Sequence, residues 1–332
     1  MTSPHPLTVD LHAHVFPPQL PELGAETGDD RWPRLVVTDD QVGEIRRGGS
    51  VFRVVQAPLW DIGRRLAVMD DHHVDVQVVS PMPIALTYWS DPGLAARYAR
   101  AFNDGVAGAV AASNGKLRGL GTVPLQDPAL AIAEMRRATG ELQLDGIEIG
   151  TVVNGRELSD ESLRGFFRAA AEGGVPLFVH PIDGGGATRC SSPVIDFAIG
   201  MHTDTALSTY ALVYGGVLEE LTDLRVCLSH GGGAFPWTHP RLGLFDSHDR
   251  KVLDTLVRRL WADALVFDPR HLPLLVERYG ADHIALGSDY PFIPPDVHDP
   301  VAMLAEAEAS GAIDGSTRSA ILGANALAFL AR

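Results

Sequence analysis

Lysine and cysteine are the scarce residue types that constrain this chain most. Only two of its 27 basic residues are lysines, Lys116 and Lys251, so any chemistry that needs a buried lysine has two candidates. The two cysteines, Cys190 and Cys227, are too few for a disulfide scaffold. Because so low a cysteine content suits a reducing compartment, we expect a cytoplasmic protein.

Long apolar runs and positive charge are also lacking. The longest apolar runs have the length of a strand and fall far short of the ~20 residues that cross a bilayer. The first residues have neither the basic nor the apolar segment of an export signal. Asp and Glu number 42 against 27 Lys and Arg, which gives a net charge of −15. Because so acidic a surface repels phosphates and anionic lipids, we expect no nucleic-acid partner and no membrane partner.

Eight short β-rich runs alternate with stretches long enough for helices. Several of the runs are continuously apolar, which is typical of parallel strands covered on both faces. This alternation predicts an α/β fold in which residues 1–332 form one (β/α)8 TIM barrel. An open α/β sheet is the alternative, but the first βα turn has no G-x-G-x-x-G motif and the chain has no Walker A lysine. The predicted strands are residues 7–12, 74–80, 117–123, 146–150, 177–180, 225–229, 262–267 and 283–287.

One segment, residues 15–60, interrupts this alternation after the first strand. It is rich in proline and glycine and contains two strand-like pieces, residues 34–38 and 50–56. We expect a small insertion that caps the C-terminal mouth of the barrel, where active sites of this fold are built. Residues 311–332 are predicted to form helices that close the barrel.

Polar side chains stand at four of the predicted strand ends. His12 and His14 stand at the end of the first strand, and because alternate residues of a strand share a face, both imidazoles should point into the barrel mouth. His180 ends the fifth strand, His230 follows the sixth and Asp289 follows the eighth. A His-x-His pair alone is weak evidence, but imidazoles and a carboxylate at several strand ends predict a divalent metal site. Zn²⁺ is the commonest ion for such nitrogen and oxygen ligands.

His12, His14, His180 and Asp289 already supply the four ligands that a catalytic zinc ion takes at most. His230 is therefore expected to act as a general acid/base beside the remaining coordination position. The alternatives are that His230 is a fifth ligand or a structural residue. No role is assigned to the other histidines, which are His5, His72, His73, His202, His239, His248, His271, His283 and His298.

The fourth predicted strand bears on the number of metal ions. Comparable barrels with two metal ions often use a carbamylated lysine at the end of that strand. In this chain the fourth predicted strand ends at residues 149–151, and neither lysine is near them. We therefore expect one metal ion per chain.

Several motifs of the sequence resemble a known family. The motifs at residues 10–14, 178–181 and 286–292 resemble the decarboxylase branch of the amidohydrolase superfamily. Within that branch the chain also resembles the family of 2-amino-3-carboxymuconate 6-semialdehyde decarboxylases, and the resemblance runs from about residue 9 to residue 330. The motifs that carry this finer resemblance are residues 51–56, 60–61, 119–124, 229–237 and 323–326.

The resemblance implies a set of roles that agrees with the strand-end analysis. It implies Zn²⁺, or Mn²⁺ as in hydroxybenzoate-acting relatives, bound by the same four ligands, with His230 as the acid/base. It also implies that Arg53 and Arg241 bind substrate carboxylates. In relatives the second arginine reaches across a dimer interface, so a homodimer is implied. Phe197 stands where the family carries a tryptophan, and it is expected to line the substrate pocket.

A guanidinium presents a planar fork that binds a carboxylate through two hydrogen bonds, so two arginines suit a dianion. The predicted function is a metal-dependent, non-oxidative decarboxylase of a muconate-type or aromatic carboxylic acid. The alternative is a metal-dependent hydrolase of an amide, lactone or ester, because the same ligands serve hydrolysis.

Overall fold

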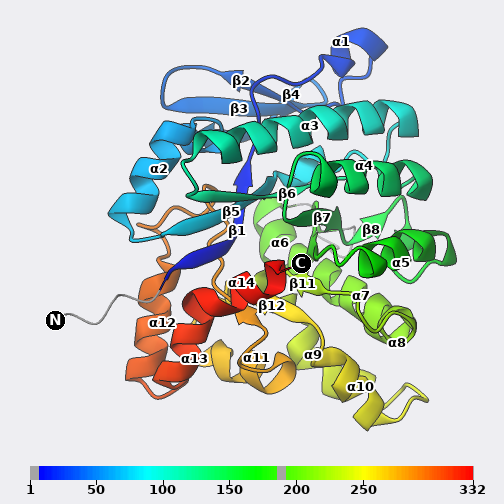
Figure 1. Cartoon of the computed structure of the whole chain (residues 1–332), viewed down its shortest axis with the longest axis vertical. Helices are drawn as coiled ribbons and strands as arrows, with labels where there is room; N and C mark the ends of the chain where they lie inside the picture. Colours follow the sequence, from blue (N-terminus) through cyan, green and yellow to red (C-terminus); the bar gives the residue numbers. More distant parts are fainter. Residues whose placement is uncertain (1–6, 185–191, 332) are drawn as a thin grey trace.

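The computed structural model describes residues 7–184 and 192–331. Eight parallel strands form one sheet in the order β1-β5-β6-β7-β10-β11-β12-β13, surrounded by helices (Figure 1), which confirms the predicted TIM barrel. Several strands are shorter than predicted; β12, for example, ends at Asp263 and β13 at Ala285. The strands are β1 (Val9–Val15), β5 (Val76–Pro81), β6 (Leu117–Gly121), β7 (Gly146–Gly150), β10 (Leu177–His180), β11 (Val226–Leu228), β12 (Trp261–Asp263) and β13 (Ile284–Ala285).

The barrel closes between β1 and the segment that follows β13. The backbone N–H of Leu11 donates to the carbonyl of Leu286 at 2.8 Å, and that of His14 donates to Tyr290 at 2.8 Å. Tyr290 also forms an isolated parallel bridge with Ala13. The first and last parts of the barrel are therefore joined next to two of the predicted ligands.

The helices between the strands begin at recognisable sequence signals. Asp91, Asp127 and Asp299 each accept hydrogen bonds from two backbone N–H groups of the helix that follows, and a proline occupies the first helical position. The main helices are α2 (Ile62–Asp71), α3 (Pro92–Ala112), α4 (Pro128–Gly140), α5 (Arg164–Glu172), α7 (Met201–Tyr214), α9 (Phe235–Leu242), α10 (Arg250–Val257), α11 (Leu272–Tyr279) and α12 (Pro300–Ala309).

The amino end of the barrel interior is a buried apolar cluster that includes Leu11, Phe178 and Phe329. Phe329 belongs to α14 (Asn325–Leu330), which contacts β1 and β13 and is drawn in red in Figure 1. Before it, α13 (Gly315–Ser319) leads into a π-helical segment, Ala320–Ala324, and a Cβ atom added at Gly323 would lie 2.1 Å from the carbonyl oxygen of Leu7. Only glycine fits so close an approach of two backbones.

Residues 15–60 contain a three-stranded antiparallel sheet, which lies at the top of Figure 1. It consists of β2 (Arg34–Val37), β3 (Val42–Arg47) and β4 (Ser50–Gln56), and the short helix α1 (Leu23–Thr27) precedes it. The middle strand was not predicted, because its glycine and three charged residues hide the alternation of a half-buried strand.

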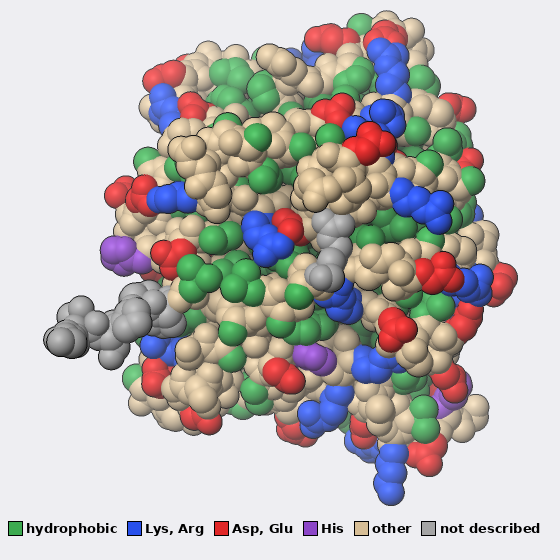
Figure 2. Space-filling model, viewed as in Figure 1, with side chains coloured by type: hydrophobic (Ala, Val, Ile, Leu, Met, Phe, Trp, Pro, Cys, Tyr) green, Lys and Arg blue, Asp and Glu red, His purple; other side chains and the backbone are tan. Residues whose placement is uncertain are grey.

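Charged side chains of both signs are interspersed over the face of the molecule in Figure 2. Across residues 7–184 and 192–331, none of the helices combines the length and the apolar character needed to span a bilayer. Cys227 is a buried free thiol in the interior of the barrel, whereas Cys190 lies outside the described residues.

Candidate metal centre

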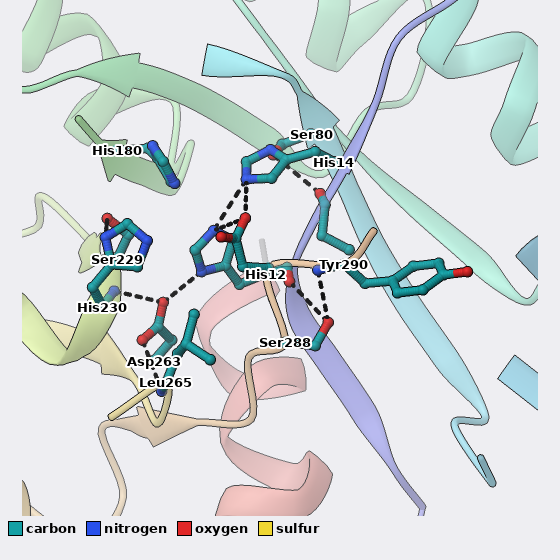
Figure 3. A network of polar contacts seen from close by, with 12 residues as sticks. His12, His14, Ser80, His180, Ser229, His230, Asp263, Leu265, Ser288 and Tyr290 are labelled. Carbon is teal, nitrogen blue, oxygen red and sulfur yellow. Dashed lines mark hydrogen bonds and ion pairs between the residues drawn. The ribbon is translucent and has the colours of Figure 1, made fainter. Parts of the chain in front are cut away.

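The four predicted ligands meet at the carboxyl end of the barrel. His12 and His14 come from β1, His180 from the end of β10, and Asp289 from the segment after β13. One ligand atom from each lies within 4.8 Å of the others. All three histidines are buried, and 16% of the Asp289 side chain is exposed. Figure 3 shows the imidazoles of His12, His14 and His180 gathered around one point.

A bulge in β1 makes this gathering possible. The pairing of β1 with β5 shifts between Asp10 and Ala13. Leu11 belongs to the apolar cluster of the barrel interior with Phe178, and yet the ring of His12 also lies 5.0 Å from the Phe178 ring. Neighbouring residues of a regular strand point to opposite faces, so the bulge turns both Leu11 and His12 inward.

Each histidine is oriented by a hydrogen bond at Nδ1. His14 Nδ1 lies 3.1 Å from the carbonyl oxygen of Pro81, and His180 Nδ1 lies 2.7 Å from that of Pro181. A carbonyl only accepts, so each Nδ1 carries the proton and each Nε2 presents a lone pair. His180 Nε2 is buried and has no hydrogen-bond partner in the described part of the chain. A buried, unpaired imidazole nitrogen among two imidazoles and a carboxylate fits a divalent cation.

The protonation of the ligands supports the same fit. Burial lowers the pKa of His14 and lowers that of His180 well below its usual value, so both rings are neutral. Burial also opposes protonation of His12, but the hydrogen bond and charge of Asp263 outweigh it and raise the pKa of His12 to about 9. A cation at Nε2 would displace that proton, because metal ligands bind in their deprotonated form.

Asp263, at the end of β12, connects the predicted ligand His12 to His230. One carboxylate oxygen lies 2.7 Å from His12 Nδ1 and accepts the backbone N–H of His230 at 2.9 Å. The other oxygen accepts the N–H of Gly231 at 2.9 Å. A single buried carboxylate therefore orients one ligand and the loop that carries the predicted acid/base.

A second buried carboxylate, Asp10, holds the segment that carries Asp289 against β1. It accepts the hydroxyl of Ser288 at 2.6 Å and the side-chain amide of Gln77 at 2.7 Å. Gln77 in turn accepts from Arg65 at 2.5 Å, and Arg65 also donates to the carbonyl of His14. This network fixes the backbone behind the ligands.

His230 lies beside the ligand group without joining it. Its ring centroid is 4.9 Å from that of His180 and 5.3 Å from that of His12. Burial, followed by the charge of His12, lowers the pKa of His230 to about 4, whereas the sequence suggested a value near neutrality. The imidazole is therefore neutral at physiological pH.

Three residues around the site adopt left-handed backbone conformations that side chains disfavour. His230, Phe267 and Asp289 have φ values of 53°, 58° and 56°. Such conformations cost free energy and persist where surrounding contacts impose them. Backbone strain is thus present at the predicted acid/base, at one ligand and in the wall of the neighbouring cavity.

A cavity of about 500 Å³ opens next to the ligands. The guanidinium of Arg53, from β4, projects into it and lies 4.4 Å from the ring centroid of Phe292 and 5.5 Å from that of Phe197. Phe52 and Phe267 also line it, so its walls are largely aromatic and apolar. The structure therefore brings Arg53 and Phe197 to the cavity, as expected for residues that would contact substrate.

Arg241 lies elsewhere. It belongs to α9, is exposed and does not line the cavity of its own chain. Its guanidinium lies 5.5 Å from the ring centroid of Phe245. Phe245, Leu244 and Trp237 are 78%, 73% and 80% exposed, which is unusual for large apolar side chains.

The sequence analysis missed three residues of the site. Asp263 and Glu148 each interrupt an apolar strand, and a buried acid in such a strand requires a partner, which was the available signal. The Glu148 carboxylate lies 3.8 Å from His14 Nδ1, on the side away from the ligand atoms, and burial raises its pKa to about 8. His202 lines the cavity from α7, and no motif in the neighbouring sequence indicated that it would.

Comparisons with known proteins identify the family and agree with the fold. The amidohydrolase family profile matches residues 9–332. A 2-amino-3-carboxymuconate-6-semialdehyde decarboxylase of Dictyostelium discoideum is 32% identical, over 98% of this chain and 91% of the relative. The apo structure of Metarhizium anisopliae IDCase has a TM-score of 0.81 at 21% identity and covers 99% of this chain and 98% of its own. A Polaromonas dihydroxybenzoic acid decarboxylase with bound manganese and the inhibitor 2-nitroresorcinol has a TM-score of 0.76 at 19% identity and covers 98% and 97%.

Proposed function

The chain belongs to the amidohydrolase family, and we propose that it removes the carboxylate of a muconate-type or aromatic acid as CO₂, without an oxidant. It is a carboxy-lyase of that family, as the resemblance of its motifs predicted. One observation carries the proposal: four ligand atoms lie within 4.8 Å of one another, beside the neutral base His230 and a cavity that contains Arg53.

The residues of the chain divide the chemistry among them. His12, His14, His180 and Asp289 would hold a divalent cation, which, when bound, acts as a Lewis acid on a substrate oxygen. Arg53 binds and orients an anionic group of the substrate through its planar fork. The aromatic walls exclude water and accept a planar carbon skeleton.

His230 manages the proton of the reaction. When the bond to the carboxylate carbon breaks, its electron pair stays on the remaining carbon, and a proton takes the place of CO₂. The neutral His230 ring accepts a proton from water or from a substrate hydroxyl and then donates it to that carbon.

The test is CO₂ release by protein that has been stripped of metal and reloaded with Zn²⁺ or Mn²⁺. The panel comprises 2-amino-3-carboxymuconate 6-semialdehyde, 2,6-dihydroxybenzoate, 2-hydroxybenzoate and 5-carboxyvanillate. We expect CO₂ from at least one acid, none with His230→Ala despite normal metal content, and wild-type rates with the control His72→Ala, a half-buried histidine that does not line the cavity. Products of ring or ester cleavage without CO₂ would identify a hydrolase instead.

We also propose one cation per chain, either Zn²⁺ or Mn²⁺. Two imidazoles of β1, one of β10 and one carboxylate suit both ions. The cation that restores turnover in this assay identifies the metal, and two tightly bound equivalents per chain in elemental analysis would contradict a mononuclear site. The cytoplasm remains the proposed location, which the low cysteine content supports.

A homodimer is the final part of the proposal. Arg241 is exposed beside the apolar side chains Trp237, Leu244 and Phe245, so a second copy covering this surface could receive Arg241 in its cavity. The test mixes two inactive variants, His230→Ala and Arg241→Ala, and lets dimers re-form. Each proposed site combines His230 of one copy with Arg241 of the other, so a mixed dimer has one intact site out of two. Because about half of the dimers are mixed, about a quarter of wild-type activity should return. No recovery, or a monomer in solution, would contradict the shared site.

A further inference from the structure

His202 occupies a position in the cavity that the proposed chemistry does not use. It lies in the first turn of α7 and is half-buried in the cavity wall. Its ring centroid is 5.7 Å from that of His230. The imidazole therefore faces the space in which a substrate would lie, next to the acid/base.

The backbone holds His202 in a fixed relation to His230. The carbonyl of His202 accepts the N–H of Ala234 at 3.0 Å, at the end of the glycine-rich loop that His230 begins. A Cβ atom at Gly233 would lie 2.3 Å from the same carbonyl oxygen, so only glycine permits this contact. Loop and helix therefore pack against each other directly through their backbones, which places the His202 ring beside that of His230.

The ring nitrogens of His202 have no hydrogen-bond partner among the described residues. Burial lowers the pKa of the ring, which keeps it neutral. A neutral imidazole offers one donor and one acceptor. Apart from the metal ligands and His230, Arg53 and His202 are the polar side chains that line the cavity in the described part of the chain. Arg53 suits an anionic group, which leaves His202 for an uncharged oxygen.

We propose that His202 determines substrate specificity by hydrogen-bonding a hydroxyl or carbonyl oxygen of the substrate, other than the carboxylate that is lost. This inference rests on the proposed function for the identity of the leaving group. It assigns the substrate class as planar carboxylic acids with a second oxygen substituent. Acids without that substituent leave a half-buried imidazole unpaired, which weakens their binding.

The test compares two acids that differ in one hydroxyl, 2,6-dihydroxybenzoate and 2-hydroxybenzoate. We expect wild type to prefer the first by about tenfold or more in kcat/KM, and we expect His202→Ala to reduce the preference to about threefold or less. His202→Gln, which keeps a donor and an acceptor, should restore part of it. His72→Ala should behave as wild type, and circular dichroism should confirm that each variant folds.

Binding of unreactive analogues separates this inference from the proposed function. In 2-nitroresorcinol and 2-nitrophenol, a nitro group replaces the carboxylate, so the ratio of their Kd values reports the second hydroxyl whether or not CO₂ is released. A ratio of about ten in wild type that falls in His202→Ala supports the role of His202 even if no acid of the panel is decarboxylated. A ratio near one in wild type, or a ratio that His202→Ala leaves unchanged, would overturn it.

Discussion

The two ends of the barrel interior are built from the same strands and have opposite properties. At the amino end, β1 contributes Leu11 and β10 contributes Phe178 to an apolar cluster that Phe329 of α14 completes. At the carboxyl end, the same strands contribute His12 and His180 to the ligand group. The boundary between the two lies within one or two residues of each strand.

The difference shows how the fold supports its site. The carboxyl end contains buried carboxylates, unpaired imidazole nitrogen and left-handed backbone at His230 and Asp289, all of which cost stability. The amino end contains closely packed apolar side chains, which supply stability. Substitutions at the two ends should therefore separate activity from stability.

The largest expected effect is the loss of a ligand. His180→Ala should reduce bound metal to less than about a tenth and activity by about a thousandfold or more, because the metal supplies the Lewis acid. The melting temperature of the metal-free protein should stay close to that of metal-free wild type. Elemental analysis and calorimetry check this, and His72→Ala is the matched histidine control. If His180→Ala failed to fold, the idea that the carboxyl end determines activity and the amino end determines stability would be wrong.

At the opposite end, Phe329→Ala should destabilise the protein by about 3–5 kcal/mol, because it opens a cavity in the apolar cluster. Metal content and kcat/KM of the remaining folded protein should be unchanged. Chemical denaturation and steady-state kinetics measure the two quantities. A fall in metal affinity with normal stability would show that the amino end also shapes the site.

Asp263→Asn tests the carboxylate that joins ligand and acid/base. We expect about 10–100-fold weaker metal affinity, because the amide lacks the charge that orients and polarises His12. Competition with a chelator measures the affinity. Unchanged affinity would mean that Asp263 only supports the backbone of His230 and Gly231, the other contacts that it makes.

The smallest of these effects is expected at Arg53. Arg53→Ala should raise KM by about tenfold and leave metal content intact, because the guanidinium lies in the cavity but outside the ligand group. Arg53→Lys should recover part of the loss, since it restores charge without the planar fork. An unchanged KM would place Arg53 outside substrate contact.

The sequence predicted the barrel and the ligand group for physical reasons. Apolar runs mark buried parallel strands, and polar residues at their ends mark the edge where loops begin, so His180 and Asp289 could be found without coordinates. The bulge in β1 could not be found, because a shift of one residue between Asp10 and Ala13 depends on how β1 pairs with β5. Without the bulge, Leu11 and His12 could not both face the interior.

Residues whose role depends on tertiary contacts could not be identified from the sequence in the same way. Asp263 was visible as an acid in an apolar strand, but its partner His12 is 251 residues away. His202 lies on a helix among polar neighbours, and only the packing of the glycine-rich loop against its carbonyl brings it to the cavity. Arg241 followed from the family resemblance, and its exposure on α9 is a property of the folded chain alone.

Because Asp289 follows the last strand, the order of synthesis constrains when the proposed cation can be bound. A chain emerging from the ribosome carries its three ligand imidazoles long before the carboxylate, and β1 gains its final partner only when Tyr290 pairs with Ala13. Metal loading should therefore be a late event, simultaneous with the last hydrogen bonds of the growing barrel. Partly made chains would hold a cation weakly and exchange it freely.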